Sequence, residues 1–167
     1  MNVRAARSED VEVVGGLLDD ATAWVGDLGY QQWPLPYPRE EIALAIARGE
    51  VYVGEEDGDA VGTVTVLADD PVYWGERTPD ALYVHKLAVR RDRAGRGIGA
   101  ALVEWVDAHA LESGRVFLRL DCLRDDAGIR RYYERLGFAH CGDLHDGHRG
   151  LELSLYERTV RSGRDVS

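Results

Sequence analysis

Three alternating glycines mark the part of this chain best suited to hold a phosphate group. They lie in the turn Ala94-Gly95-Arg96-Gly97-Ile98-Gly99, between an expected strand and an expected helix. A helix N-terminus leaves N–H groups unpaired at the positive end of its dipole, so such a turn can bind an anion. The glycines leave room for a diphosphate, and Arg93 and Arg96 could bind its oxygens. The alternative is a turn that only tightens a strand–helix corner.

The glycine spacing leaves more than one phosphate ligand open. No Gly-Lys-Ser/Thr occurs, which excludes the triphosphate-binding P-loop. Gly95-x-Gly97-x-x-Ala100 matches the dinucleotide fingerprint, and Asp121 lies about 20 residues on, where that fingerprint has a ribose-binding acid. However, the residues from Arg90 to Ala94 separate the strand from the first glycine, and few βα units are expected. These two features argue against a dinucleotide-binding fold, but the match to the fingerprint keeps a nicotinamide-dependent oxidoreductase as an alternative.

The segment from Leu87 to Leu102 resembles the acetyl-CoA signature of the GNAT acetyltransferase superfamily. That signature is a strand, a charged turn and then Gln/Arg-x-x-Gly-x-Gly/Ala leading into a helix, with Gly97 and Gly99 at the two small positions. Ala94 departs from it, since the family has Gln or Arg there. The resemblance implies that acetyl-CoA is bound by Leu87, Ala88, Val89, Arg93, Ala94, Gly95, Arg96, Gly97, Ile98, Gly99 and Ala100. Because the Ala94 side chain is short, the backbone amides should provide most of the contacts with the diphosphate.

A second segment, Arg131 to Phe138, is similar to the family's FYEKLGF element. The resemblance implies that Tyr133 protonates the leaving thiolate, for which an ordinary tyrosine pKa of about 10 is suited. Asp126 stands where the family often has Asn, and the resemblance makes it a cofactor contact. The alternatives are that Tyr133 only packs in the core, and that the chain is a noncatalytic acyl-CoA sensor.

An amine acceptor must lose a proton before it attacks a thioester. Period-2 alternation places Tyr83, His85 and Leu87 on one face of a strand, so His85 is the candidate base. Asp121, on the neighbouring strand, is another candidate base and is also assigned to acceptor binding. The alternative for His85 is a half-buried histidine with a satisfied hydrogen bond. The alternative for Asp121 is an ordinary edge carboxylate.

Aromatic and amide side chains in the expected helices and loops could line the acceptor pocket. Aromatic rings can also bind a cation through their faces. The expected acceptor is a small-molecule or peptide primary amine, attacked directly in a ternary complex, with no metal. The residues assigned to it, besides Asp121, are Trp24, Gln32, Trp33 and Trp74.

The elements that must position these groups follow from periodicity and turn residues. Ser8 is the expected N-cap of a helix from about Glu9 to Leu28. The resemblance implies a mixed α/β sheet, mostly antiparallel, with splayed middle strands and about four helices, in one domain over 1–167. The tail from about Thr159 is expected to be flexible. The other expected strands are 3–6, 51–54, 60–67, 82–89, 116–122, 138–143 and 151–156; the other helices are 39–48, 97–111 and 129–136; and 69–80 is expected to be a polar loop.

The amino-acid composition of the chain limits the classes of partner that it can bind. The net charge of −10 over 167 residues disfavours binding to nucleic acid or an anionic membrane. No stretch approaches the ~18 apolar residues of a membrane span, and no leader is expected. Cys122 and Cys141 lack zinc-site spacing and are expected to be buried free thiols, which fits the cytoplasm. A homodimer is common among similar proteins.

Overall fold

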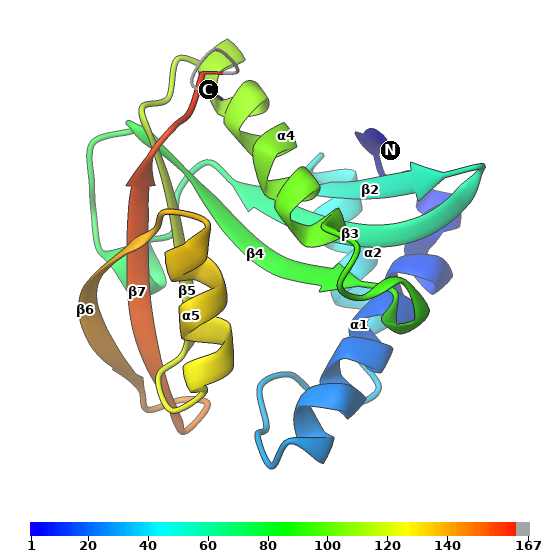
Figure 1. The fold of residues 1–167 in the computed structure, drawn as a ribbon, viewed down its shortest axis with the longest axis horizontal. Coiled ribbons are helices and arrows are strands. Elements are labelled where there is room, and N and C mark those ends of the chain that lie inside the picture. The colour runs from blue at the N-terminus through cyan, green and yellow to red at the C-terminus, as the bar shows by residue number, and fades with distance from the viewer. Residues whose placement is uncertain (163–167) are drawn as a thin grey trace. The chain divides into compact units, whose positions relative to one another are not determined.

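The structure, a computed structural model, describes residues 1–162, whose strands form one mixed sheet (Figure 1). The sheet order is β1-β2-β3-β4-β5-β7-β6, in which β4 and β5 pair in parallel. The strands are β1 (Asn2–Ala5), β2 (Val51–Glu56), β3 (Asp59–Leu67), β4 (Ala81–Val89), β5 (Phe117–Leu123), β6 (Ala139–Asp146) and β7 (Leu151–Thr159). The helices are α1 (Val11–Asp27), α2 (Arg39–Ala47), α3 (Pro71–Trp74), α4 (Ile98–Glu112) and α5 (Ala127–Arg135), with 3-10 turns at Ser8–Asp10 and Arg91–Arg93.

The chain divides into two compact units, which are described separately. The first comprises residues 1–66 and 86–105, and the second comprises 67–85 and the chain from Val106 onward. Strand β4 contributes to both, because the division falls between His85 and Lys86. The expected mixed, mainly antiparallel α/β sheet is confirmed, and α3 adds a short helix to the expected four.

In the first unit, α1 and α2 bury their apolar stripes against β2 and β4. Val14 and Leu18 of α1 share one core cluster with Ile42, Val53 and Ala88. Spacings of three and four residues place Val14, Leu17 and Leu18 on one helix face, as an amphipathic helix requires. This packing fixes the end of β4 that leads into the glycine turn.

Glycine at position 62 lets α4 approach β3 closely. A Cβ added to Gly62 would lie 2.9 Å from Leu102 Cδ1 and 3.1 Å from the Ala88 carbonyl oxygen. Real Cβ atoms almost never come that close, so only glycine fits here without a shift. The close approach seats the start of α4, and with it the preceding turn.

In the second unit, strands β4, β5 and β7 pack against helices α3 and α5. One face holds Ala81 and Tyr83, packed with Trp74 of α3. The α5 helix lies against β5 (Figure 1), and Tyr156 of β7 donates a hydrogen bond from its hydroxyl to Glu134 of α5 at 3.0 Å. The parallel β4–β5 register runs only from Ala81 to Tyr83, so His85 lies beyond the last pair, as splayed strands require.

Some expectations about the elements are wrong. Ser8 does not cap α1, because residues 8–10 form a 3-10 turn whose Asp10 carboxylate accepts from the Arg7 amide at 2.7 Å. The 69–80 loop contains α3, since Pro71 already has the backbone angle of a first helical residue. Cys141 is exposed rather than buried.

Two expectations concern the ends and the membrane. The flexible tail expected from about Thr159 falls partly on 163–167, which lie outside the described residues, while β7 continues to Thr159. Among the described residues, no helix is both long enough and apolar enough to cross a membrane.

Candidate active site

The glycine turn has the backbone shape and the open space that a diphosphate needs. Gly95 and Gly97 have φ angles of 78° and 79°, values that favour glycine. A Cβ added to either would meet no heavy atom within 4 Å. The Gly97 carbonyl accepts from Ala101 at 2.9 Å, which begins the hydrogen bonding of α4. The turn is thus an exposed backbone cradle at a helix N-terminus.

The side chains around this cradle differ in how free they are. Arg93 Nη1 lies 3.6 Å from Glu56 Oε2, so Arg93 already has an ionic partner. Arg96 is exposed at the turn. Ala94 is exposed, whereas Ile98 and Gly99 are buried and Ala100 is half-buried. The buried positions can contribute only backbone atoms, which agrees with a cradle built mainly of amides.

The last residues of β4 leave one edge of their backbone facing away from β3. The Arg90 amide donates to the Val61 carbonyl at 2.8 Å, and the Ala88 carbonyl faces Gly62. Because neighbouring residues in a strand point their N–H and C=O groups to opposite edges, Leu87 and Val89 face the other edge. This arrangement suits the expected strand-like pairing with pantetheine.

Lys86 interrupts the regular pleat of β4. Its φ of 49° lies in the left-handed region, which is uncommon for a residue with a side chain. Period-2 alternation therefore places Tyr83 and His85 on one face of β4, but it does not continue through Lys86 to Leu87.

Tyr133 lies on α5 in a buried aromatic cluster of the second unit. Its ring centroid lies 5.3 Å from that of Tyr132 and 5.9 Å from that of Phe138, both edge-on. Burial raises the pKa of the Tyr133 phenol far above its usual value, and the nearby Cys122 thiol raises it further. The expectation of an ordinary pKa was wrong, because it ignored desolvation. The phenol keeps its proton throughout the pH range of enzyme assays.

Cys122 is a core thiol. Its side chain is buried in β5, and burial raises the pKa of the thiol to about 12. A protonated thiol is a poor nucleophile, so the position does not suit a covalent acetyl carrier.

Asp126 begins α5. Its Oδ1 accepts hydrogen bonds from the amides of Gly128 at 3.0 Å and Ile129 at 3.1 Å. The carboxylate thereby satisfies two amides that the helix itself leaves unpaired. It holds in place the helix that carries Tyr133.

We expect Asp126→Ala to lower the free energy of unfolding by about 1 kcal/mol, the usual cost of losing such a cap. Urea denaturation measures the change. Asp125→Ala is the matched control, because that neighbouring carboxylate is 71% exposed and pairs with Arg124. Equal stability of the two variants would contradict the capping role, and a weaker affinity for CoA in Asp126→Ala alone would support the expected cofactor contact.

His85 lies between two carboxylates in the second unit. Its Nε2 is 2.9 Å from Asp70 Oδ2, and its Nδ1 is 3.8 Å from Asp121 Oδ1. The three side chains are only 16%, 8% and 10% exposed, in the order His85, Asp70, Asp121. The structure thus brings together the two residues that the sequence selected, His85 and Asp121. It adds Asp70, which the sequence left in an undifferentiated polar loop.

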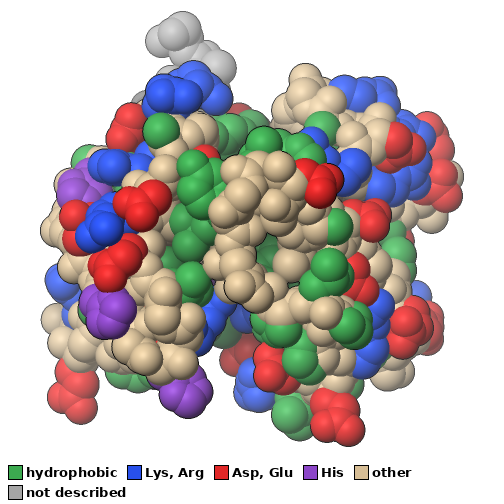
Figure 2. Space-filling view, turned by 90° about the horizontal axis from the view of Figure 1, so that it is seen from below, with side chains coloured by type: hydrophobic (Ala, Val, Ile, Leu, Met, Phe, Trp, Pro, Cys, Tyr) green, Lys and Arg blue, Asp and Glu red, His purple; other side chains and the backbone are tan. Residues whose placement is uncertain are grey.

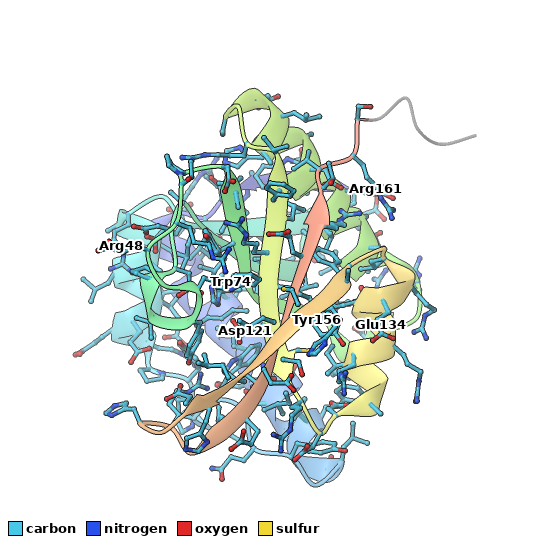
Figure 3. All side chains as sticks on the ribbon, turned by 90° about the vertical axis from the view of Figure 1, so that its left-hand side faces the viewer. Arg48, Trp74, Asp121, Glu134, Tyr156 and Arg161 are labelled. Carbon is cyan, nitrogen blue, oxygen red and sulfur yellow. The ribbon has the colours of Figure 1, made fainter. Side chains whose placement is uncertain are left out.

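A charged cluster continues along the same sheet face. Arg119, two residues before Asp121, donates to Glu157 at 2.7 Å and to the Tyr83 hydroxyl at 3.0 Å. Figure 3 shows Asp121 on β5 and Trp74 on α3, whose ring is 5.5 Å from the Arg119 guanidinium. The same sheet face therefore carries two neighbouring charged groups, Arg119 paired with acids and His85 between two acids.

The four side chains expected to line the acceptor pocket occupy different settings. Trp24 is 42% exposed and stacks under the Arg91 guanidinium, 4.0 Å from the ring centroid. Trp33 is half-buried and packs edge-on to Tyr37, and Gln32 is half-buried beside it in sequence. Trp74 is buried against Tyr83, which makes its ring part of the core, so we leave it out of the proposed acceptor site.

Charge is mixed at the surface. Acidic and basic side chains are interspersed over the face that Figure 2 shows, although acids exceed bases in the chain by 30 to 20. This face lacks the concentrated positive charge on which phosphate-backbone binding depends.

Comparison with known proteins decides the family. The family model for the acetyltransferase (GNAT) family matches residues 18–138, which include the glycine turn and Tyr133. The chain belongs to the GNAT family. GNAT membership makes acetyl-CoA the expected cofactor of this chain, and the dinucleotide alternative is dropped.

Individual proteins agree. The uncharacterized N-acetyltransferase YesJ of Bacillus subtilis (strain 168) is 30% identical over 155 residues, 88% of this GNAT chain and 86% of YesJ. Streptothricin acetyltransferase of Streptomyces lavendulae is 31% identical over 119 residues, which span 71% of this chain and 54% of that protein. The structure of yncA, a putative acetyltransferase from Salmonella typhimurium with its cofactor acetyl-CoA, has a TM-score of 0.71 at 16% identity, covering 97% of this chain and 95% of yncA.

Proposed function

We propose that this GNAT acetyltransferase moves the acetyl group of acetyl-CoA to a primary amine by direct attack, with His85 as base and Tyr133 as acid. The observation that supports this most is the His85 imidazole, held between two carboxylates in the same unit as the buried, protonated Tyr133. Deprotonation of an ammonium and protonation of a leaving thiolate are the two proton transfers that the reaction requires.

The first unit fits the donor. When bound, acetyl-CoA supplies an acetyl thioester open to attack by an amine. The amides from Gly95 onward would bind the diphosphate at the start of α4, where a side chain at Gly97 would fill the space. The outward edge of β4 at Leu87 and Val89 would pair with the pantetheine, and an N–H there would polarise the thioester carbonyl.

The second unit supplies the proton transfers. His85 takes one proton from the acceptor ammonium and leaves a neutral amine. The C–N bond forms, the C–S bond breaks, and Tyr133 gives its phenolic proton to the departing sulfur. The amide nitrogen loses its second proton as the product forms, which restores Tyr133. One proton leaves to the solvent through His85 in each turnover.

The acceptor that we propose is a small-molecule amine. A relative with an antibiotic in its name, streptothricin acetyltransferase, matches 71% of the chain. The exposed Trp24 and the half-buried Trp33 offer apolar faces of the kind that line small-molecule sites. A peptide N-terminus is the acceptor against which this proposal is tested.

We expect thiol release from acetyl-CoA that depends on an added primary amine. A panel of a streptothricin-type antibiotic, an aminoglycoside, a polyamine and a short peptide, read by thiol release and by the mass of the product, measures it. N-acetylation of a small molecule would support the proposal, and acetylation of the peptide alone would redirect the acceptor class. CoA binding without turnover on any amine would favour a sensor, and an acetyl group on Cys122 during turnover would overturn direct attack.

A further inference from the structure

Asp70 has an unusual position for a buried carboxylate. It is the N-cap residue of α3, with φ −149° and ψ 69°, yet its side chain makes no capping hydrogen bond. Its backbone carbonyl accepts from the Trp74 amide at 2.9 Å, so the backbone takes part in the helix while the carboxylate does not. The carboxylate instead lies 2.9 Å from His85 Nε2 at 8% exposure. Helix capping does not explain why an acid is buried here.

The Asp70 contact selects one form of the His85 ring. An ionised carboxylate only accepts hydrogen bonds, so Nε2 must donate. In the neutral imidazole Nδ1 then carries the lone pair. That nitrogen faces Asp121 Oδ1 at 3.8 Å, which is too far for a direct hydrogen bond. Two atoms 3.8 Å apart can share one nitrogen atom as a hydrogen-bond partner, and because Asp121 Oδ1 is buried, neighbouring side chains must move aside to admit that nitrogen.

We propose that Asp70 is a positioning residue for His85 and that the protonated acceptor amine binds against His85 Nδ1 and Asp121 Oδ1. The inference rests on the proposed function and adds to it the ring nitrogen that accepts the proton and the residue that aims it. The ligand that this pair recognises is a primary ammonium group, which has three N–H donors for one lone pair and one carboxylate.

The proton step balances within this cluster. The ammonium gives one proton to Nδ1 and keeps the electron pair of that N–H bond. His85 becomes an imidazolium with both nitrogens protonated, and Asp70 stabilises the new charge through Nε2–H. The Asp121 carboxylate holds the remaining N–H groups of the amine. The deprotonated nitrogen then attacks, and His85 returns its proton to solvent.

Other charged groups near His85 in the second unit are already engaged. On β4 the next side chain of the same face is Tyr83, whose hydroxyl accepts from Arg119. On β5 the Arg119 guanidinium pairs with Glu157 and Asp80. The acids that lie against the ring are Asp70, from the start of α3, and Asp121, from β5.

The kinetic test compares Asp70→Asn and Asp70→Ala with the matched control Asp69→Asn, because Asp69 is the exposed neighbour. The asparagine oxygen can still accept from Nε2–H but carries no charge. We expect kcat to fall about tenfold in Asp70→Asn and further in Asp70→Ala, with the KM for acetyl-CoA unchanged. The acidic limb of the kcat profile should move to lower pH, because the imidazolium loses a neighbouring negative charge.

A fall in rate without movement of the acidic limb would mean that Asp70 is merely structural, and this would overturn the proposal. So would equal rates in Asp70→Asn and the control. Loss of wild-type activity on treatment with EDTA would also overturn it, because the cluster would then hold a cation instead of transferring a proton.

The ring form is tested without any turnover. Long-range ¹H–¹⁵N spectra of the ¹⁵N-labelled protein report which nitrogen of each neutral histidine carries the proton, and His85→Gln identifies the His85 signals among the five histidines. We expect Nε2–H in the wild type and a mixture of both forms in Asp70→Ala. An Nδ1–H signal in the wild type would overturn the positioning role even if acetyl transfer is confirmed. If no amine is acetylated, the proposed function fails while this measurement still decides the role of Asp70.

Discussion

Replacing Tyr133 by phenylalanine is expected to lower kcat for amine acetylation by about a hundredfold, the low end of what a positioned general acid contributes. The change removes one hydroxyl and keeps the ring, so the edge-on contacts with Tyr132 and Phe138 persist. Affinity for CoA should stay within about twofold, because the phenol acts on the leaving sulfur and not on the diphosphate. Steady-state kinetics and calorimetric titration with CoA measure the two effects.

Tyr132→Phe is the matched control, since it removes the same atom one residue earlier in the same helix. It should leave kcat unchanged. Similar falls in both variants would point to a packing effect, and an unchanged kcat in Tyr133→Phe would remove the acid role. Urea denaturation of both variants checks that neither has lost its fold.

The raised pKa of Tyr133 has a consequence for the pH profile. Because burial disfavours the phenolate, the protonated donor is retained at pH values where an exposed tyrosine has already ionised. A decline of activity near pH 10 is therefore not expected from Tyr133. Such a decline, if it occurs and persists in Tyr133→Phe, belongs to another group.

Much of the fold was predictable because its local signals agree with its packing. The expected strands 51–54 and 60–67 and the expected helix from about Glu9 to Leu28 match β2, β3 and α1 to within a few residues. The N-cap of α1 and the α3 helix were missed for physical reasons. Asp10 forms an ion pair with Arg4 at 2.7 Å, and local spacing does not reveal this contact. Helix α3 is a single turn, which is too short to show a helical period in the sequence.

Some residues of the candidate site were predictable from the sequence and others were not. Gly95, Gly97 and Tyr133 lie in contiguous motifs, so the sequence alone could select them. His85 and Asp70 are 15 residues apart and meet only because the chain between them returns along β4. Spacing carries no record of such a contact. The high pKa of Tyr133 was missed for a related reason, since desolvation depends on how deeply the folded chain buries the ring, which a sequence motif does not reveal.

Gly97→Val is expected to weaken CoA binding about a hundredfold, or ~2.8 kcal/mol at about 1.4 kcal/mol per tenfold change. Two causes act together. The φ of 79° is strained for a β-branched residue, and the new side chain occupies the open space in front of the α4 N-terminus. Gly97→Ala adds a smaller side chain and should give an intermediate loss. Calorimetric titration with CoA measures all three proteins.

Strain alone would also destabilise the fold, so the decisive control is a glycine with the same backbone but no role in the cradle. Gly58, in the β2–β3 hairpin of the same unit, has a φ of 84° and equally open surroundings. Gly58→Val should lower the Tm about as much as Gly97→Val, since both force a branched residue into the left-handed region. It should leave the Kd for CoA unchanged. If both variants bind CoA equally well, the diphosphate lies elsewhere; if both bind equally poorly, the loss reflects the fold and not the turn.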